Sequence, residues 1–371
     1  MKKILFLIHD LGQGGAEKVL VNLVNNMDPA KFDISVTTLF GGGVNERFLA
    51  PHIHYRTVFP KAIPGNSHLM KLLSPRQLHR LCVKEHYDIE IAYLEGTATR
   101  IVSGCEDRNT RLLAWVHSTI TTPKTAAHSY CNFEEAVRCY RKFLHIVFVA
   151  QSNQDQFQKV FPMLATCCVK YNTVESDRIL QMSQEPVSAD VLATNVFRMI
   201  GVGSLKPVKG FDRLIRVHQR LLENGYPVHT YILGKGPDQE ALAKYAAQIG
   251  AADSVTFLGY DTNPYRYVRN CDLFVCSSHS EGFSTAATEA LILGTPVCTV
   301  DVSGMKEMLG ENDEYGIVTE NNEEALYQSI KRLLDDPVLL AHYKEKAKVR
   351  GRSFSTETTV KAVEDLLLEM G

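Results

Sequence analysis

The sequence predicts an α/β protein built from two doubly wound parallel sheets, and three observations support this. Short apolar runs typical of strands alternate with helical patterns along most of the 371 residues. Such alternation indicates parallel sheets with helices on both faces. A polar stretch with poor hydrophobic periodicity, residues 175–195, divides the chain into two halves of domain size. Ligands of such sheets bind beyond the carboxyl ends of the strands, so the expected site is a cleft between two facing domains.

Each half supplies five clear strands. In the first half they are expected at residues 3–8, 34–39, 89–93, 112–116 and 146–149. In the second half they are expected at residues 197–202, 229–233, 254–258, 273–276 and 296–300. Helical patterns lie between them, among them residues 211–224, 238–249 and 284–293. The predicted domains are residues 1–180 and 181–352, and a C-terminal helix within 353–371 either caps the second domain or packs back on the first.

Composition excludes several classes of protein. The net charge of −2 gives no basic excess of the kind that nucleic-acid binding requires. Nine cysteines are scattered without a Cys-x-x-Cys motif and without His/Cys clusters at ligand spacing. We therefore expect reduced, mostly buried thiols in a cytoplasmic protein, and no metal site. The apolar start is short and lacks a cleavage site, which favours a first core strand over a signal peptide, and no run reaches the ~18 apolar residues of a membrane span.

Two carboxylates flank a predicted turn between a strand and a helix. Glu281 and Glu289 are separated by seven residues in Glu-Gly-Phe-Ser-Thr-Ala-Ala-Thr-Glu, directly after the strand at 273–276. The free N–H groups and the dipole of the helix favour a negative charge in front of the turn. Carboxylates accept hydrogen bonds from hydroxyl groups. A ligand with both phosphates and sugar hydroxyls, such as a nucleotide-sugar, suits both features.

In each half of the chain, one glycine-containing loop follows the first strand. Gly14 and Gly15 belong to the first loop, where glycine allows close backbone approach to a ligand, although a plain tight turn explains them equally well. A nicotinamide-cofactor site is rejected because the third glycine and the acid after the second strand are missing. The second loop, residues 201–212, carries Lys206 and Lys209 into a helix. A lysine beside a helix N-terminus is a good pyrophosphate contact.

Seven short motifs occur along the chain, at residues 14–17, 209–212, 234–237, 257–259, 281–289, 294–297 and 304–307. Taken in order and at these spacings, they resemble glycosyltransferase family 4, the glycosyl transferases group 1. The likeness covers nearly the whole chain. The family is a large retaining one with the GT-B fold of two facing Rossmann-like domains.

The resemblance implies a set of site residues. It places Glu289 on the ribose, Lys209 on the diphosphate, and Glu281 with the backbone after it on the donor sugar and phosphate. It places His117, which ends the strand at 112–116, near the reacting sugar; alone, such a histidine is more often structural. The implied catalytic residues are His117, Lys209 and Glu281. The implied nucleotide-sugar contacts are Gly14, Gly15, Gly203, Ser204, Lys209, Gly259, Glu281, Gly282, Phe283, Ser284 and Glu289.

One position departs from the family pattern. The family commonly has Gly-Arg-Leu where this chain has Gly203-Ser204-Leu205. Ser204 donates a hydrogen bond but brings no charge. Lys206, two residues on, is a candidate substitute, although arginine and lysine are not interchangeable at a bidentate site. Losing one charge-assisted contact costs roughly 1.5–3 kcal/mol. Lys209 and the helix N-termini remain to hold the diphosphate.

The expected activity is retaining transfer of a hexosyl or N-acetylhexosaminyl unit from a nucleotide-diphosphate sugar. Uracil is the default base from family usage, and it is expected near residues 259–263. Lys209 and the helix N-termini stabilise the leaving diphosphate, and Glu281 positions the donor. No cofactor and no metal are implied, because the Asp-x-Asp pattern of metal-dependent transferases is absent from the sequence. Domain closure is expected to exclude water.

The acceptor is expected to be a saccharide or a lipid-linked saccharide of a surface polysaccharide or glycolipid. Residues 61–86 form a basic amphipathic segment, interrupted by Pro75, and residues 138–142 add a second basic patch. Such segments lie on anionic membranes or are simply solvated surface helices. Peripheral contact with the inner face of the cell membrane is therefore a hypothesis. Two alternatives stay open, a non-catalytic partner of another glycosyltransferase and a nucleotide-sugar epimerase.

Overall fold

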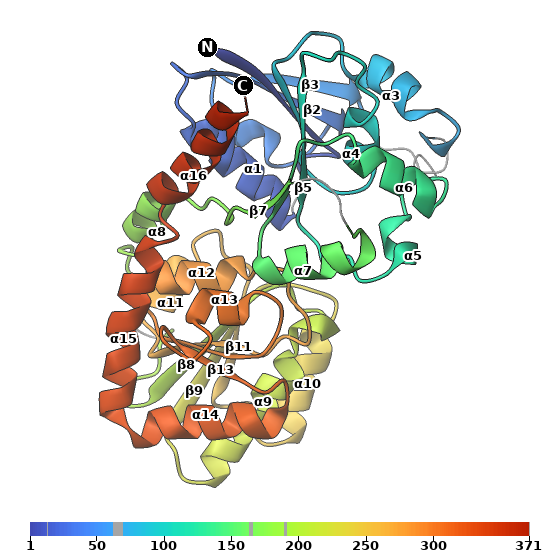
Figure 1. Ribbon diagram of the computed structural model, residues 1–371. Coiled ribbons are helices and arrows are strands. Elements are labelled where there is room, and N and C mark those ends of the chain that lie inside the picture. The colour runs from blue at the N-terminus through green and yellow to red at the C-terminus, as the bar shows by residue number, and fades with distance from the viewer. Residues whose placement is uncertain (13, 62–69, 163–165, 189–190, 371) are drawn as a thin grey trace. The chain divides into compact units, whose positions relative to one another are not determined.

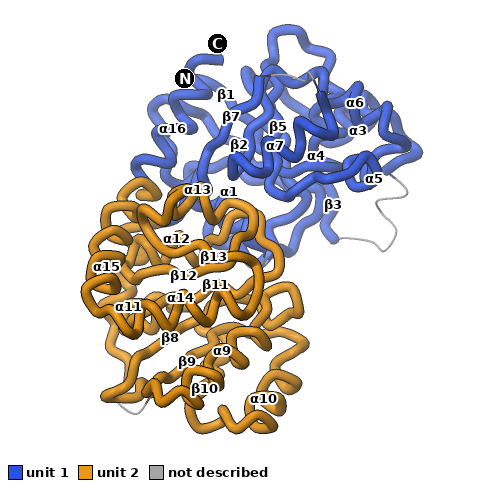
Figure 2. Tube along the Cα trace, turned by 60° about the horizontal axis from the view of Figure 1, so that its bottom comes forward, with its two compact units in different colours: residues 1–174, 356–371 blue, residues 175–355 orange. Residues whose placement is uncertain are grey.

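A computed structural model describes residues 1–12, 14–61, 70–162, 166–188 and 191–370 of the chain. The chain forms two compact units, which Figure 2 shows in different colours. Unit 1 is Met1–Val174 together with Thr356–Gly371, and unit 2 is Glu175–Ser355. The boundaries expected from the sequence fall at 180/181 and 352/353. The polar stretch at 175–195, expected to be a linker, contains helix α8 (Ser176–Met182).

In the described part of unit 1, seven parallel strands form one sheet in the order β3-β2-β1-β4-β5-β6-β7. Their bounds are β1 Lys2–Ile8, β2 Phe32–Phe40, β3 His54–Phe59, β4 Ile89–Ala92, β5 Arg111–Val116, β6 His145–Phe148 and β7 Thr166–Val169. The direction of winding reverses between β1 and β4. The loops that leave these two strands therefore diverge at the carboxyl edge, which is where such sheets bind ligands.

Helices cover both faces of this sheet (Figure 1). They include α1 (Gly15–Asn26), α3 (Pro75–Cys82), α4 (Thr97–Val102), α5 (Pro123–Ala126), α6 (Phe133–Tyr140), α7 (Gln151–Val160) and α16 (Thr356–Glu369), with a short 3-10 turn, η1, at Glu46–Phe48. The C-terminal α16 lies beside α1 (Figure 1). Its Glu364 accepts a hydrogen bond from the Asp28 N–H at 2.7 Å, and Lys2 Nζ donates to the Leu367 carbonyl at 2.8 Å. These contacts make α16 part of unit 1.

In the described part of unit 2, six parallel strands form a sheet in the order β10-β9-β8-β11-β12-β13. Their bounds are β8 Phe197–Val202, β9 Val228–Leu233, β10 Val255–Gly259, β11 Leu273–Cys276, β12 Val297–Val300 and β13 Ile317–Thr319. The remaining elements are η2 Pro207–Lys209, α9 Phe211–Glu223, α10 Gln239–Gln248, α11 Tyr265–Arg269, α12 Thr285–Ile292, α13 Met305–Leu309, α14 Glu323–Asp335 and α15 Pro337–Arg352. The winding reverses between β8 and β11. Two doubly wound parallel sheets were predicted, and this prediction is confirmed.

Three strands were not predicted: β3, β7 and β13. Each lies at an edge of its sheet, where one side of the strand pairs with no other strand among the described residues. Residues of β3 and β7 are at most half-buried, and β13 has only three residues. Without long buried apolar runs, these strands lack the pattern that revealed the central ones.

Candidate active site

Most of the predicted site residues of unit 2 come from the two loops at the reversal of its sheet. Gly203, Ser204 and Lys209 follow β8, and Glu281 follows β11. Glu289 lies on α12, the helix that the second loop opens. Lys209 and Glu281, 72 residues apart in the chain, are brought into contact by this topology. Gly259 ends β10, two strands away from β8 in the sheet, where its φ of +71° and the open space beside its Cα suit a turn.

The two loops are locked against each other by glycine and by hydrogen bonds. Gly210 has φ of +61°, and a Cβ at this position would collide with the carbonyl oxygen of Ser277. The His279 N–H donates to the Val208 carbonyl at 2.7 Å, and Ser277 Oγ donates to the Lys209 carbonyl at 3.2 Å. The backbone of the lysine loop is thus held directly on the acidic turn.

The centre of the site is a hydrogen-bonded group of Lys209, Glu281 and Ser278. Glu281 Oε1 accepts from Lys209 Nζ and from Ser278 Oγ, each at 2.6 Å. The side chain of Glu281 is 10% exposed and that of Lys209 is 25% exposed. Glu281 therefore fixes the direction of the lysine, whose side chain remains partly exposed; an ammonium group suits an anionic ligand.

Helix α12 starts directly after this group. Ser284 is its N-cap, and Ser284 Oγ accepts from the Ala287 N–H at 3.3 Å. The ring of Phe283 is buried and packs edge-on against Phe354 at 5.9 Å between centroids. The side chains of Ser284 and Phe283 thus have structural partners. A ligand contact at residues 282–284 would therefore use the backbone. The first turn of a helix leaves N–H groups that suit a phosphate.

Glu289 lies on the inward face of α12 and is 9% exposed. Tyr265, the first residue of α11, donates its hydroxyl to Glu289 Oε1 at 3.1 Å. Burial and the neighbouring carboxylate raise the pKa of Tyr265, so its hydroxyl stays protonated and donates to Glu289. Sequence reasoning missed Tyr265. Its only signal is its position a few residues after β10, at the same edge of the sheet.

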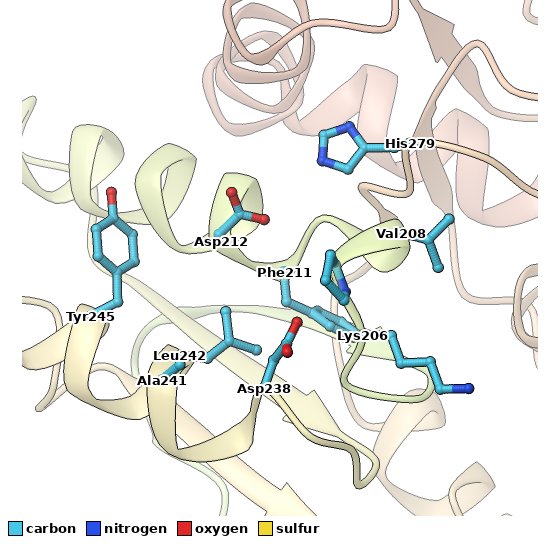
Figure 3. A pocket seen from close by; sticks show the side chains of 10 residues that line it. Lys206, Val208, Phe211, Asp212, Asp238, Ala241, Leu242, Tyr245 and His279 are labelled. Atoms are coloured by element: carbon cyan, nitrogen blue, oxygen red, sulfur yellow. The ribbon is translucent and has the colours of Figure 1, made fainter.

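A pocket of about 510 Å³ lies beside η2 (Figure 3). It is lined by Lys206, Pro207, Val208, Phe211, Asp212, Asp238, Ala241, Leu242, Tyr245 and His279. Lys209, Glu281 and Glu289 do not line it. Lys206 thus lines this pocket whereas Lys209 does not, and Ser204 is exposed just before Lys206 in the chain.

In unit 1, Gly14 and Gly15 begin α1 at the reversal of the sheet. Gly14 is the N-cap, and a Cβ there would collide with the carboxylate of Glu17, which folds back over the start of the helix. Burial raises the pKa of Glu17. The Gly12 N–H donates to Asp10 Oδ1 at 2.7 Å, which closes the loop before the helix. The atoms nearest to a Cβ at Gly14 thus belong to a flexible carboxylate, and a Cβ at Gly15 would meet no atom within 4 Å.

His117 directly follows β5 at the carboxyl edge of the same sheet. Its backbone N–H donates to Glu95 Oε2 at 2.9 Å, and its ring lies 4.8 Å from that of Tyr93 between centroids. Among the described residues, its buried Nε2 atom has no hydrogen-bond partner. Burial lowers the pKa of His117 to about 4, although Glu95 acts in the opposite direction. At neutral pH the ring is therefore uncharged, with a nitrogen available for one hydrogen bond.

Comparison with known proteins agrees with this geometry. The model of the family "Glycosyl transferases group 1" matches residues 189–350. The chain is 28% identical over 368 residues to the Campylobacter jejuni N-acetylgalactosamine-N,N'-diacetylbacillosaminyl-diphospho-undecaprenol 4-alpha-N-acetylgalactosaminyltransferase, covering 95% of this chain and 96% of that protein.

Solved structures share the fold over the full length. Anabaena HepE in complex with UDP superposes with a TM-score of 0.80 at 19% identity, covering 99% of this chain and 100% of that one. The lipopolysaccharide outer core galactosyltransferase WaaB in its apo form superposes with a TM-score of 0.74 at 16% identity, covering 100% of this chain and 99% of that one. The predicted GT-B class is thereby confirmed. Among the helices of the described residues, none is both long and apolar enough to cross a membrane.

Proposed function

The chain belongs to the glycosyl transferases group 1, and on this premise we propose that it transfers a hexosyl or N-acetylhexosaminyl unit from a UDP-sugar to a saccharide or lipid-linked saccharide, with retention of configuration. The observation that carries the proposal is the group of Lys209, Glu281 and Ser278, placed at the sheet reversal and at the start of α12. It combines a positive charge, a hydroxyl acceptor and helix N–H groups. A sugar diphosphate needs all three.

The donor roles follow from burial and partners. Glu289 accepts hydrogen bonds from the ribose hydroxyls. The Tyr265 hydroxyl donates to Glu289 Oε1 and orients the carboxylate. Lys209 and the first turn of α12 take the diphosphate, and Glu281 positions the lysine and the sugar. HepE was solved with UDP, which supports uracil as the base. At 9% exposure Glu289 presents little surface, so small shifts in α12 relative to α11 should matter for nucleotide binding.

The proposed chemical step needs charge stabilisation and no cofactor. The bond between the anomeric carbon and the phosphate oxygen breaks, and its electron pair leaves with the nucleoside diphosphate. The acceptor hydroxyl forms the new bond on the same face, and its proton passes to the departing phosphate. Lys209 offsets the charge that grows on that phosphate. Uncharged His117 supplies a hydrogen bond to the transferred sugar rather than a proton, because its pKa is lowered to about 4.

The proposed acceptor is a saccharide on a lipid diphosphate. The C. jejuni relative is named for a diphospho-undecaprenol acceptor. In unit 1, α3 carries exposed Arg76 and Arg80, which share the carboxylate of Glu106 at 2.5 and 3.3 Å. Leu72, just before this helix, is 80% exposed. A basic helix beside an exposed leucine suits the surface of an anionic membrane.

The structure also explains Pro75, which was expected to interrupt this segment. Pro75 instead begins α3, with Ser74 and Gln77 forming a capping box around it. The helix turns Leu78 and Cys82 into the core and leaves its arginines outside. The basic segment therefore has a folded helical part at 75–82, while residues 62–69 of the same segment lie outside the described part of the chain.

Reversing two charges on α3 tests the membrane contact. The double variant Arg76→Glu, Arg80→Glu should cosediment with anionic lipid vesicles at least about 30-fold more weakly, since each basic side chain at such a surface contributes about 1 kcal/mol. High salt should weaken wild-type binding in the same way. The control is Lys244→Glu with Lys344→Glu on unit 2, both exposed. Equal loss in the control, or wild-type binding that is absent or insensitive to salt, would contradict the proposed contact.

The proposed activity is tested by transfer itself. Wild-type protein is incubated with labelled UDP-hexoses and UDP-N-acetylhexosamines and with a polyprenyl-diphosphate-linked saccharide. We expect label in the lipid-linked product for one donor, with an α-linkage when the donor is α-linked. Donor isomerisation without an acceptor would indicate an epimerase instead. A product with inverted configuration at the anomeric carbon would overturn the proposed retention but not the proposed transfer.

A further inference from the structure

Unit 1 contains a cluster of three potential metal ligands that the proposed transfer reaction does not use. His79, Glu90 and Cys105 come from α3, from β4 and from the chain just after α4. One ligand atom from each lies within 4.8 Å of the others. Because 11 and 15 residues separate them in the chain, no sequence motif announces the cluster.

Glu90 is the unusual member. It lies on a central strand, paired in register with Leu5 of β1 and Leu112 of β5, and its side chain is 2% exposed. A carboxylate among such residues is costly unless an opposite charge accompanies it. Its carboxylate oxygen Oε2 lies 2.8 Å from His79 Nε2. A buried pair of this kind rarely adds net stability compared with apolar residues, so its presence suggests another use.

The backbone brings the third ligand to this pair. A Cβ at Gly104 would collide with the carbonyl oxygen of Pro75, so glycine allows the start of α3 to touch the end of α4. Cys105 follows immediately, and its Sγ atom lies within 4.8 Å of the ligand atoms of His79 and Glu90.

We propose that His79, Glu90 and Cys105 form a binding site for a zinc ion. Thiolate sulfur, imidazole nitrogen and carboxylate oxygen are the three ligand types of protein zinc, and three protein ligands leave a fourth position for water. A divalent ion with one thiolate, one carboxylate and a neutral imidazole makes a site of zero net charge, which suits burial. Binding would release the proton of the thiol. His79 is 14% exposed, which provides a way in from the surface.

The role of this site is structural. Glu90 is the second residue of β4, so the cluster lies toward the amino end of the strand, whereas His117 and the glycine loop lie at the carboxyl edge. The ion would join α3, β4 and the end of α4. It would therefore stabilise the sheet face that carries the basic helix, without entering the chemical step.

Cobalt serves as the spectroscopic probe for this site. Untagged full-length protein is stripped with chelator and titrated with Co²⁺, and then with Zn²⁺. We expect one equivalent of Co²⁺ to produce a thiolate-to-cobalt charge-transfer band in the near ultraviolet, which Zn²⁺ abolishes by displacement. Zn²⁺ should also raise the melting temperature of the stripped protein.

Three variants decide the outcome. Cys105→Ser and His79→Gln should lose the band and the zinc-dependent rise in melting temperature. Cys82→Ser should keep both, because Cys82 is buried in the same helix but outside the cluster. Circular dichroism without metal shows whether each variant is folded, and an unfolded one is replaced by Glu90→Gln. No band in the wild type, or a band that survives Cys105→Ser, would overturn the site and leave only a buried His79–Glu90 ion pair.

Discussion

Replacing Lys209 by alanine should lower the turnover number for sugar transfer by roughly a hundredfold to a thousandfold, the cost of removing one preorganised donor from a developing negative charge. Lys209 Nζ is held at 2.6 Å from Glu281, so the ammonium group needs no reorganisation when the diphosphate leaves. Ser204 stands where the family commonly places an arginine, which makes Lys209 the main side-chain cation of the proposed leaving-group site. Steady-state kinetics with saturating donor and acceptor measure this loss.

Two further variants separate charge from packing. Lys209→Gln keeps a hydrogen-bond donor but removes the charge, and it should lose most of the same activity. Lys244→Ala removes an exposed lysine of α10 and should stay within about twofold of wild type, because surface substitutions of this kind change little. A turnover number in Lys209→Ala equal to that of Lys244→Ala would show that another group stabilises the leaving diphosphate.

Replacing Glu289 by alanine should raise the KM for the donor by about tenfold to a hundredfold, the range for a lost charge-assisted hydrogen bond. The turnover number should change less, because ribose contacts act equally in ground and transition states. Tyr265→Phe leaves the carboxylate but removes the hydroxyl that orients it at 3.1 Å, and its effect should be smaller. Glu240→Ala on the exposed face of α10 is the control. An unchanged KM in Glu289→Ala would remove Glu289 from the donor site.

Much of this site could be predicted because the topology of a doubly wound sheet places the ends of β8 and β11 together. The family resemblance assigned Lys209 and Glu281 to one donor site, but their direct contact was not predicted and is seen only in the structure. The partner of Glu289 could not be predicted in this way. Tyr265 meets Glu289 only because α11 packs beside α12, and no periodicity in the sequence reports how two helices pack.

The same limit applies to unit 1. His117 was placed correctly at the end of a strand, but its uncharged state depends on burial against Tyr93, which only the fold shows. The cluster of His79, Glu90 and Cys105 escaped notice because its members belong to three different elements. Sequence spacing finds ligands on one element or one loop, whereas this cluster needs the glycine contact between Gly104 and Pro75.

The central claim is that unit 2 binds a nucleoside diphosphate through Glu289 and Lys209, and calorimetric titration tests it most directly. UDP, GDP, ADP and CMP are each titrated into wild-type protein and into Glu289→Ala. The account predicts selective binding of UDP to the wild type and at least about tenfold weaker binding to the variant. Absence of binding by every nucleotide would contradict it, and the chain would then be better explained as a non-catalytic partner of another glycosyltransferase.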